Sequence, residues 1–294
     1  MALETLPPTI RAAAWMCGAL VSFIAMAIAG RELSAELTTF EILFFRSLVG
    51  LVAVVIVLRR SGWAQVRTRV FGTHLIRNVS HFAGQYGWFY GIALIPLTEV
   101  FAIEFTVPIW TAILATIMLG ERMNRLRVVA IAVGFTGILV ILRPGIAIVS
   151  PATLAVVGGA LAYAFSHVFT KRLAGTQTPL CILFYMTVIQ LPLGLVTALP
   201  HWTWPSTRLY PWVAVVALTA LSAHYCLARA FRLADATVVM PLDFLRLPLI
   251  AVIGLFLYGE PLNVWVFAGA AIVLAGVWLN LKSAQYATAV RARA

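Results

Sequence analysis

Charged residues are scarce in this sequence. Only 11% of its 294 residues are Asp, Glu, Lys or Arg, whereas 62% are hydrophobic. Soluble domains carry about 25% charged residues, so a fold of this composition could not cover its own surface in water. The chain also contains several apolar runs of roughly 20 residues, the length that a helix needs to cross a bilayer. The composition therefore excludes a soluble domain and predicts a polytopic membrane protein.

Cysteines and enzyme motifs are also sparse. Cys17, Cys181 and Cys226 lie singly in apolar segments, which excludes a disulfide framework and a spaced metal site and favours a packing role. The sequence has no G-x-x-x-x-G-K-[ST] loop, no H-E-x-x-H and no G-x-S-x-G, the patterns of nucleotide hydrolysis, zinc proteolysis and serine hydrolysis. We expect no enzyme activity, no cofactor and no metal.

Acidic residues are outnumbered, ten against 21 basic ones, for a net charge of +11. Such a charge can indicate nucleic-acid binding. Here, however, fifteen of the 21 Lys and Arg residues fall in alternate loops on one side of the predicted spans, three fall in the loops of the other side, and three lie within spans. This asymmetry sets orientation in a membrane. The expected partner is the lipid bilayer and no nucleic acid, with both termini cytoplasmic.

Hydrophobic runs predict ten membrane-spanning helices. They are 12–29, 39–58, 75–95, 98–119, 128–142, 151–170, 179–199, 211–228, 237–258 and 262–281. The segment Ala27-Ile28-Ala29 resembles a signal-peptide cleavage site, but the first span has a counterpart in the sixth. We expect it to remain in the protein.

Two of these runs, EVFAIEFTVPIWTAILATIMLGE and TVVMPLDFLRLPLIAVIGLFLYGE, share one pattern. Glu104 lies 16 residues before Gly120 in the first, and Asp243 lies 16 residues before Gly259 in the second, an offset of 139 residues. The pattern predicts an internal repeat, with one half over residues 12–142 and the other over 151–281. Five spans in each half place the two halves in opposite senses across the membrane. The predicted fold is an all-α integral membrane protein of ten transmembrane helices, built as two inverted five-helix repeats.

These features resemble the EamA domains of the drug/metabolite transporter superfamily over nearly the whole chain. The resemblance rests on the tandem five-span units, on Phe44-Phe45-Arg46, and on the two prolines followed by Gly-Glu, Pro108 with Gly120-Glu121 and Pro248 with Gly259-Glu260. It implies transport of a small metabolite without ATP hydrolysis, in the inner membrane of a bacterium. Met186 stands where a second copy of Arg46 would fall, so any role of that arginine is one-sided.

Ionisable residues inside spans indicate a polar pathway, because each costs at least ~2.5 kcal/mol to insert. Arg46 lies roughly 10 Å into its span at 1.5 Å per residue; it either binds an anionic group of the cargo or pairs with Glu104 or Glu41. Glu104 and Asp243 either hold an amine of the cargo, take up a coupling proton, or pair with an arginine. Asp243 and Arg246, three residues apart, could satisfy each other.

Other polar and aromatic residues within spans complete the predicted substrate-binding set. His81 and His224 are candidate proton carriers, since histidine titrates near ambient pH, although a lone histidine is more often simply hydrogen-bonded. Tyr86, Trp110 and Tyr163 could line a cavity, with core packing as the alternative reading.

The sequence thus predicts a secondary active transporter that works by alternating access between its two halves. The expected activity is export of amino acids or amino-acid-derived carboxylates, including an opine-type metal chelator. Uptake of a small vitamin or metabolite is the alternative, and an integral membrane enzyme or a sensor is the alternative of another class. Coupling to protons and assembly into a homodimer are left open.

Overall fold

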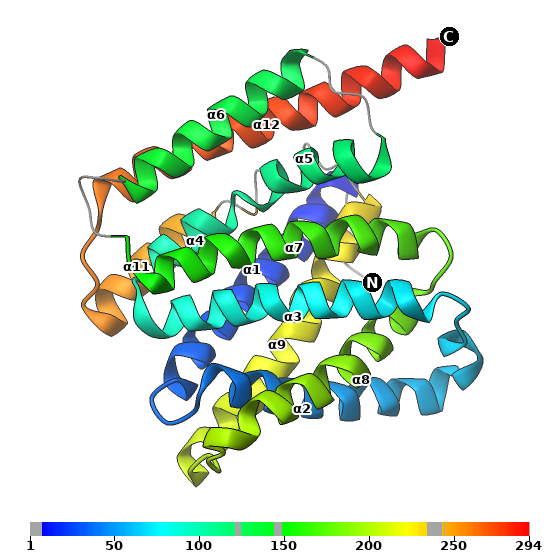
Figure 1. Cartoon of the computed structure of the whole chain (residues 1–294), viewed down its shortest axis with the longest axis vertical. Helices are drawn as coiled ribbons and strands as arrows, with labels where there is room; N and C mark the ends of the chain where they lie inside the picture. Colours follow the sequence, from blue (N-terminus) through cyan, green and yellow to red (C-terminus); the bar gives the residue numbers. More distant parts are fainter. Residues whose placement is uncertain (1–7, 121–124, 144–148, 234–242, 244, 294) are drawn as a thin grey trace.

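The computed structural model describes residues 8–120, 125–143, 149–233, 243 and 245–293, and every regular element in them is a helix. Figure 1 shows the arrangement. The α-helices are α1 (Pro8–Leu33), α2 (Thr39–Ser61), α3 (Phe71–Leu94), α4 (Leu97–Glu104), α5 (Val107–Leu119), α6 (Arg125–Leu142), α7 (Pro151–Ala174), α8 (Pro179–Ala198), α9 (Tyr210–Leu233), α11 (Arg246–Tyr258) and α12 (Val264–Arg293).

Eight helical segments in the described part of the chain are long and apolar enough to cross a membrane. The third predicted span corresponds to α3, which has 24 residues but carries a stripe of polar side chains and is not among the eight. The ninth predicted span falls partly on residues outside the description, and its described part, α11, has 13 residues. The structure therefore describes a multi-pass helical membrane protein with eight such segments, and the count of ten stays a prediction.

Helices from the two predicted halves pack in pairs. The closest pairings are α1 with α9, α3 with α7, α2 with α8, and α6 with α12. Exchanging the halves turns the first pair into the second and leaves the other two unchanged. The glycines of α6 and α12 follow the same exchange. A Cβ on Gly137 would lie 2.7 Å from the Gly269 carbonyl oxygen, and one on Gly276 would lie 2.8 Å from the Ala130 carbonyl oxygen. The repeat boundaries themselves stay a prediction.

The fourth predicted span is interrupted in its middle. Helix α4 ends at Glu104, Phe105 and Thr106 form a turn, and α5 begins at Val107. Pro108 explains the interruption, because proline has no N–H to donate to the carbonyl four residues earlier and its ring clashes there. That carbonyl belongs to Glu104. The sequence therefore ends the helix at the acid and places Glu104 at a helix terminus inside the protein.

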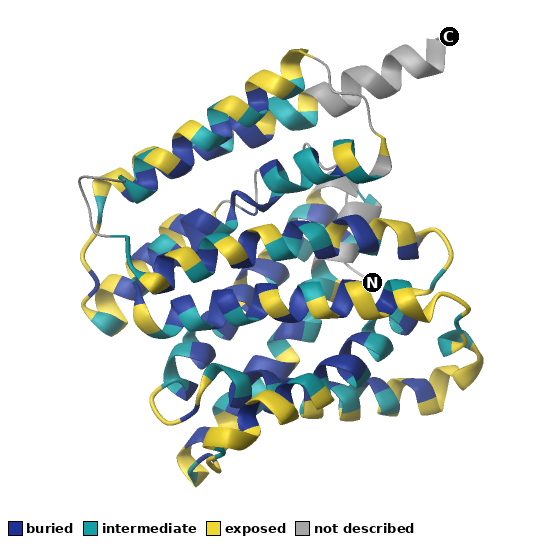
Figure 2. Cartoon of the chain, viewed as in Figure 1, coloured by how far each residue is buried: buried dark blue, intermediate teal, exposed yellow. Residues whose placement is uncertain are grey.

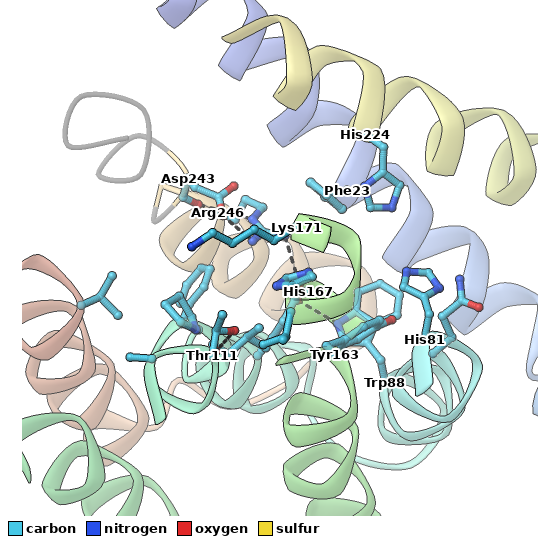
Figure 3. Close-up of a pocket in the computed structure, with 18 of the residues that line it drawn as sticks. Phe23, His81, Trp88, Thr111, Tyr163, His167, Lys171, His224, Asp243 and Arg246 are labelled. Carbon is cyan, nitrogen blue, oxygen red and sulfur yellow. Dashed lines mark hydrogen bonds and ion pairs between the residues drawn. The ribbon is translucent and has the colours of Figure 1, made fainter. Parts of the chain in front are cut away.

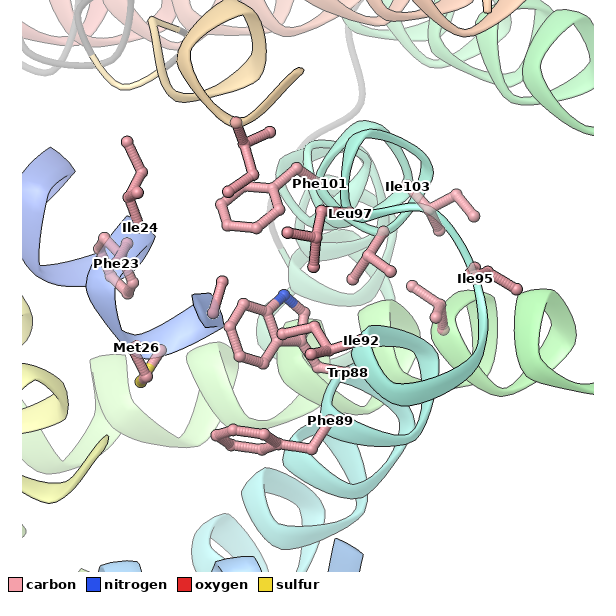
Figure 4. Close-up of a cluster of buried hydrophobic side chains, with 14 of the residues drawn as sticks. Phe23, Ile24, Met26, Trp88, Phe89, Ile92, Ile95, Leu97, Phe101 and Ile103 are labelled. Atoms are coloured by element: carbon pink, nitrogen blue, oxygen red, sulfur yellow. The ribbon is translucent and has the colours of Figure 1, made fainter. Parts of the chain in front are cut away.

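The interior and the exterior of the bundle are both apolar. Figure 4 shows the buried cluster around α1, α3 and α4, in which Phe89, Ile92, Leu97 and Phe101 are at most 2% exposed. Many large hydrophobic residues are also exposed, among them Val21, Ile117 and Phe256, and Figure 2 shows where the exposed positions lie along the helices. Exposed apolar residues in such number are typical of a lipid-facing protein.

Candidate functional site

A cavity of about 540 Å³ lies between the helices of both halves. Its size is typical of a site for a small organic molecule. Polar and aromatic side chains line it, and Figure 3 shows how they converge from different helices. Those that matter below are Phe23, Arg46, His81, Gln85, Trp88, Glu104, Arg127, Tyr163, His167, Lys171, His224, Asp243 and Arg246.

Seven of the nine predicted substrate-binding residues lie in this wall. They are Arg46, His81, Glu104, Tyr163, His224, Asp243 and Arg246. Tyr86 and Trp110 are not among the lining residues. Tyr86 stacks on Phe40 with ring centroids 4.7 Å apart, and the Trp110 indole N–H donates to Thr106 Oγ1 at 3.1 Å. The observed contacts of Tyr86 and Trp110 therefore agree with core packing, the alternative to lining a cavity.

The two acids related by the 139-residue offset meet at one arginine. Arg246 Nη2 lies 2.6 Å from Asp243 Oδ2, and Arg246 Nη1 lies 3.6 Å from Glu104 Oε1. The guanidinium also lies over the ring of Phe23, 4.5 Å from its centroid, a cation–π arrangement. The predicted pairing of Asp243 with Arg246 is therefore present, and Arg246 is held from several sides.

Glu104 has a second partner on α3. The Trp88 indole N–H donates to Glu104 Oε2 at 2.9 Å. Trp88 was not predicted as a site residue, although a signal was available. The polar residues His81 and Gln85 and the Trp88 indole recur at spacings of four and three along the sequence, which places them on one face of a helix.

Arg46 differs from Arg246 because no carboxylate in the described residues lies within ion-pair distance of it. It is 5% exposed. The oxygen and nitrogen of the Gln85 amide are assigned from the surrounding hydrogen bonds. In that orientation, both terminal nitrogens of Arg46 donate to the Gln85 oxygen, and the Nη2 distance is 2.8 Å. The Gln85 nitrogen donates to Gln190 Oε1 at 2.9 Å. Arg46 Nε has no hydrogen-bond partner. Within the described part of the chain, the guanidinium is thus held by neutral groups only.

The predicted alternatives for Arg46, pairing with Glu104 or with Glu41, are not what these residues form. Glu104 faces Arg246 and Trp88. Glu41 caps its own helix by accepting from Thr38 N, and it also accepts from Thr203 Oγ1 at 2.7 Å. Both acids are occupied elsewhere. A buried guanidinium without a charged partner is costly, and Arg46 has no such partner among the described residues.

Three histidines are among the lining residues. The rings of His81 and His224 lie 6.3 Å apart, and His81 Nδ1 lies 3.0 Å from Gln190 Nε2. His167 joins them in the lining, together with Lys171 one turn further along α7. Neither His167 nor Lys171 was predicted as a site residue, because both were assigned to the inner end of a span and its loop.

A partly buried ionic cluster joins the ends of α1, α3 and α11. Arg31 Nη2 lies 3.0 Å from Glu260 Oε1 and donates to the Ile95 carbonyl at 2.7 Å. The Leu97 backbone N–H donates to Glu260 Oε2 at 2.8 Å. We call these four residues the outer lock, because the distribution of positive loops predicts that this end is the outer one. The lock joins α1, the turn between α3 and α4, and the segment between α11 and α12.

Comparison with protein-family profiles identifies the family of the chain. The profile of the EamA-like transporter family matches residues 10–143 and 150–282. The chain belongs to the EamA-like transporter family. It is therefore a multi-pass membrane transporter, as its sequence predicts, and its bacterial relatives point to the inner membrane.

Relatives of this transporter are named for different substrates. The S-adenosylmethionine uptake transporter of Rickettsia prowazekii is 26% identical over 88% of each chain. The riboflavin transporter of Rhizobium johnstonii is 34% identical over 74% of this chain and 72% of the relative. The pseudopaline exporter CntI of Pseudomonas aeruginosa is 26% identical over 83% of this chain and 86% of the relative. A crystal structure that is 15% identical matches the fold with a TM-score of 0.64 over 92% of this chain and 96% of its own.

Proposed function

We propose that this EamA-like transporter is a secondary active exporter of a small carboxylate-bearing metabolite, an amino acid or an amino-acid derivative, and that it works by alternating access. The observation that carries the proposal is Arg46, a buried guanidinium in the cavity wall that faces only neutral hydrogen-bond partners among the described residues. Arginine binds carboxylates through two parallel hydrogen bonds. A cargo carboxylate supplies the missing counter-charge.

The charge of the wall supports an acidic cargo. Its basic side chains are Arg46, Arg127, Lys171 and Arg246, and its acidic side chains are Glu104 and Asp243. The acids are both directed at Arg246. Neither of them lies within ion-pair distance of Arg46, so an anionic group of the cargo can supply the counter-charge of that guanidinium.

The names of the relatives include both directions of transport, export and uptake. The relative named as a pseudopaline exporter fits the export of an opine-type metal chelator. The relative named for S-adenosylmethionine uptake favours import as the second candidate. Positive loops determine how a protein sits in the membrane and not the direction of flow, so the direction requires an experiment on cells.

Untargeted mass spectrometry of cells and medium tests the proposal. Three strains are compared: one that lacks the chain, one that carries it, and one that carries Arg46→Ala at the same membrane level. We expect a carboxylate-bearing compound to accumulate inside the first and third strains and to leave only the second. A compound left behind in the medium would overturn export in favour of import. Conversion without a change of compartment would indicate an enzyme, and identical profiles would contradict transport.

Alternating access predicts that the outer lock opens and closes during transport. We expect Glu260→Gln to weaken it, because the amide loses the charge that Arg31 pairs with, at a cost of about 1 to 2 kcal/mol, or roughly 5- to 30-fold in the open population. Met26 lines the cavity. A cysteine placed there, in a protein without other cysteines, measures how accessible the cavity is to a reagent added on the outer side. Its labelling by a membrane-impermeant maleimide should accelerate at least about 5-fold.

The control for this variant is Glu36→Gln. Glu36 pairs with Arg208 at 2.8 Å, but that pair is exposed, with Arg208 at 73%. Exposed ion pairs contribute about 0 to 1 kcal/mol, and we expect the labelling rate to stay unchanged. Equal labelling of wild type and Glu260→Gln would show that the lock is a static structural contact.

A further inference from the structure

The two carboxylates at Arg246 are not equivalent. Arg246 Nη2 donates a short charged hydrogen bond of 2.6 Å to Asp243 Oδ2, whereas Glu104 Oε1 lies 3.6 Å from Arg246 Nη1. One guanidinium close to two carboxylates cannot balance both charges, and the nearer carboxylate takes most of the stabilisation. Asp243 is therefore the committed partner of Arg246, and Glu104 keeps a loosely balanced negative charge within the protein.

Burial and the helix dipole disfavour the charged form of Glu104. The side chain is only 18% exposed, so its carboxylate has lost most of its hydration. It is the last residue of α4, where the helix dipole places partial negative charge. Its other oxygen accepts a hydrogen bond from the Trp88 N–H, which stabilises the carboxylate but supplies no positive charge.

The helices packed against α4 carry the other groups of the cavity wall that contains Glu104. Asp243 and Arg246 come from the α11 side, Tyr163, His167 and Lys171 line the cavity from α7, and Arg127 lines it from α6. The lining residues from α12 are Val277, Asn280 and Leu281, and none of them titrates. From α3, Trp88 contacts the carboxylate directly and His81 lies in the same wall.

We propose that Glu104 is the site where a coupling proton binds, and that a proton and the ammonium group of the cargo exclude each other there. This inference deepens the proposed export of an amino-acid-like compound and rests on it. The charged carboxylate holds the cargo ammonium while Arg46 holds its carboxylate. The proton that later binds Glu104 from water in the cavity neutralises that carboxylate and displaces the ammonium. Entry of protons thus drives the cargo out, one for one.

Infrared difference spectroscopy of the purified full-length protein, recorded between alkaline and acidic buffer without cargo, tests the proton site. We expect the carbonyl stretch of a protonated carboxylic acid to appear in wild type as the pH falls, and to be absent in Glu104→Gln. The amide has the shape of the protonated acid and can still accept the Trp88 hydrogen bond. A band unchanged in Glu104→Gln would overturn the proposal.

Asp243→Asn is the matched variant, because it removes the competing carboxylate from Arg246. Glu104 then becomes the remaining described acid facing that guanidinium, and we expect its protonation to shift to lower pH by at least about one unit, a tenfold change in proton affinity. Loss of the band in Asp243→Asn with retention in Glu104→Gln would assign the proton to Asp243 and contradict the inference. Because cargo is absent, failure here is distinguishable from failure of the proposed export.

Exclusion between proton and ammonium is tested with a defined probe. Proteoliposomes that contain a pH-sensitive dye receive an equimolar mixture of the twenty protein amino acids on one side, alongside the compound that the metabolite comparison identifies. Cargo movement should carry protons in the opposite direction in wild type. Glu104→Gln should lose both the proton flux and most of the cargo movement, because the amide neither binds the proton nor holds the ammonium. Protons that move in the same direction as the cargo would contradict exclusion at Glu104.

Discussion

Replacement of Arg46 by alanine is expected to abolish transport, with a loss of about 100-fold or more in rate per folded protein, because truncating one partner of a buried charged pair costs about 2 to 5 kcal/mol. Arg46 has no described carboxylate of its own to leave behind unpaired, so removing it should not destabilise the fold. The measurement is uptake or efflux of the identified compound, normalised to membrane protein. Arg46→Lys keeps the charge but loses the two-pronged geometry and should retain an intermediate rate.

Arg77→Gln is the control for this prediction. Arg77 is also buried on the face of a helix, at 7% exposure, but it donates to Thr170 Oγ1 and Asn78 Oδ1 and is not among the cavity-lining residues. We expect transport per folded protein to stay within a few-fold of wild type. Equal losses in both variants would mean that a buried positive charge is needed for structure, and normal transport by Arg46→Ala would make Arg46 structural.

Replacement of Gly87 by alanine is expected to remove most of the folded protein from the membrane. A Cβ on Gly87 would overlap the Ala155 carbonyl oxygen and would lie 3.0 Å from Gly159 Cα. Both are backbone atoms, so relief requires α3 and α7 to move apart, and overpacking of this kind costs about 1 to 3 kcal/mol or more. We expect a drop of about tenfold in the monodisperse protein recovered after detergent extraction.

Gly158→Ala is the matched control, on the same helix pair and next to the contact. A Cβ at Gly158 would meet nothing within 4 Å, and alanine is the better helix former. Its yield should equal or exceed that of wild type. Equal yields of Gly87→Ala and wild type would show that the backbones of α3 and α7 are not in close contact.

The sequence predicts the membrane class and much of the cavity wall, for identifiable reasons. Low charge content and apolar runs determine the class. The acids Glu104 and Asp243 stand out because each interrupts an apolar run at the same place in the repeat, and the structure brings both to Arg246. Arg46 stands out by its depth in an apolar segment. Their roles with cargo stay predictions.

What the sequence does not predict depends on contacts between the two halves. The position of Glu41 near the outer end of the second predicted span suggests a solvated rim residue, but Thr203 from the other half covers it and it is fully buried. The position of Arg77 near the inner end of the third predicted span suggests a side chain that extends to the membrane surface, but Thr170 on α7 holds it inside. The Gly-Glu motif suggests that Glu260 meets basic residues near its own turn, as Glu121 precedes Arg122 and Arg125, but Glu260 reaches Arg31 on α1. No local pattern records such partners.

The interruption of the fourth span is a different case, because the information was local. Pro108 removes the hydrogen bond of the Glu104 carbonyl, so the position of the break follows from the sequence. The repeated prolines indicated a shared design but not that the helix would end at the acid. Spacing between a proline and a polar residue four positions earlier is a signal that could have predicted this terminus.

If Arg46 binds the carboxylate of a small metabolite during transport, flux must depend on that carboxylate. Proteoliposomes of purified protein receive either the compound found in the metabolite comparison or its methyl ester, at equal concentration. We expect the acid to move at least about 50-fold faster than the ester in wild type, the effect of about 2 to 3 kcal/mol, and Arg46→Ala to remove this preference. Equal flux of acid and ester, or an unchanged preference in Arg46→Ala, would show that Arg46 does not bind the carboxylate.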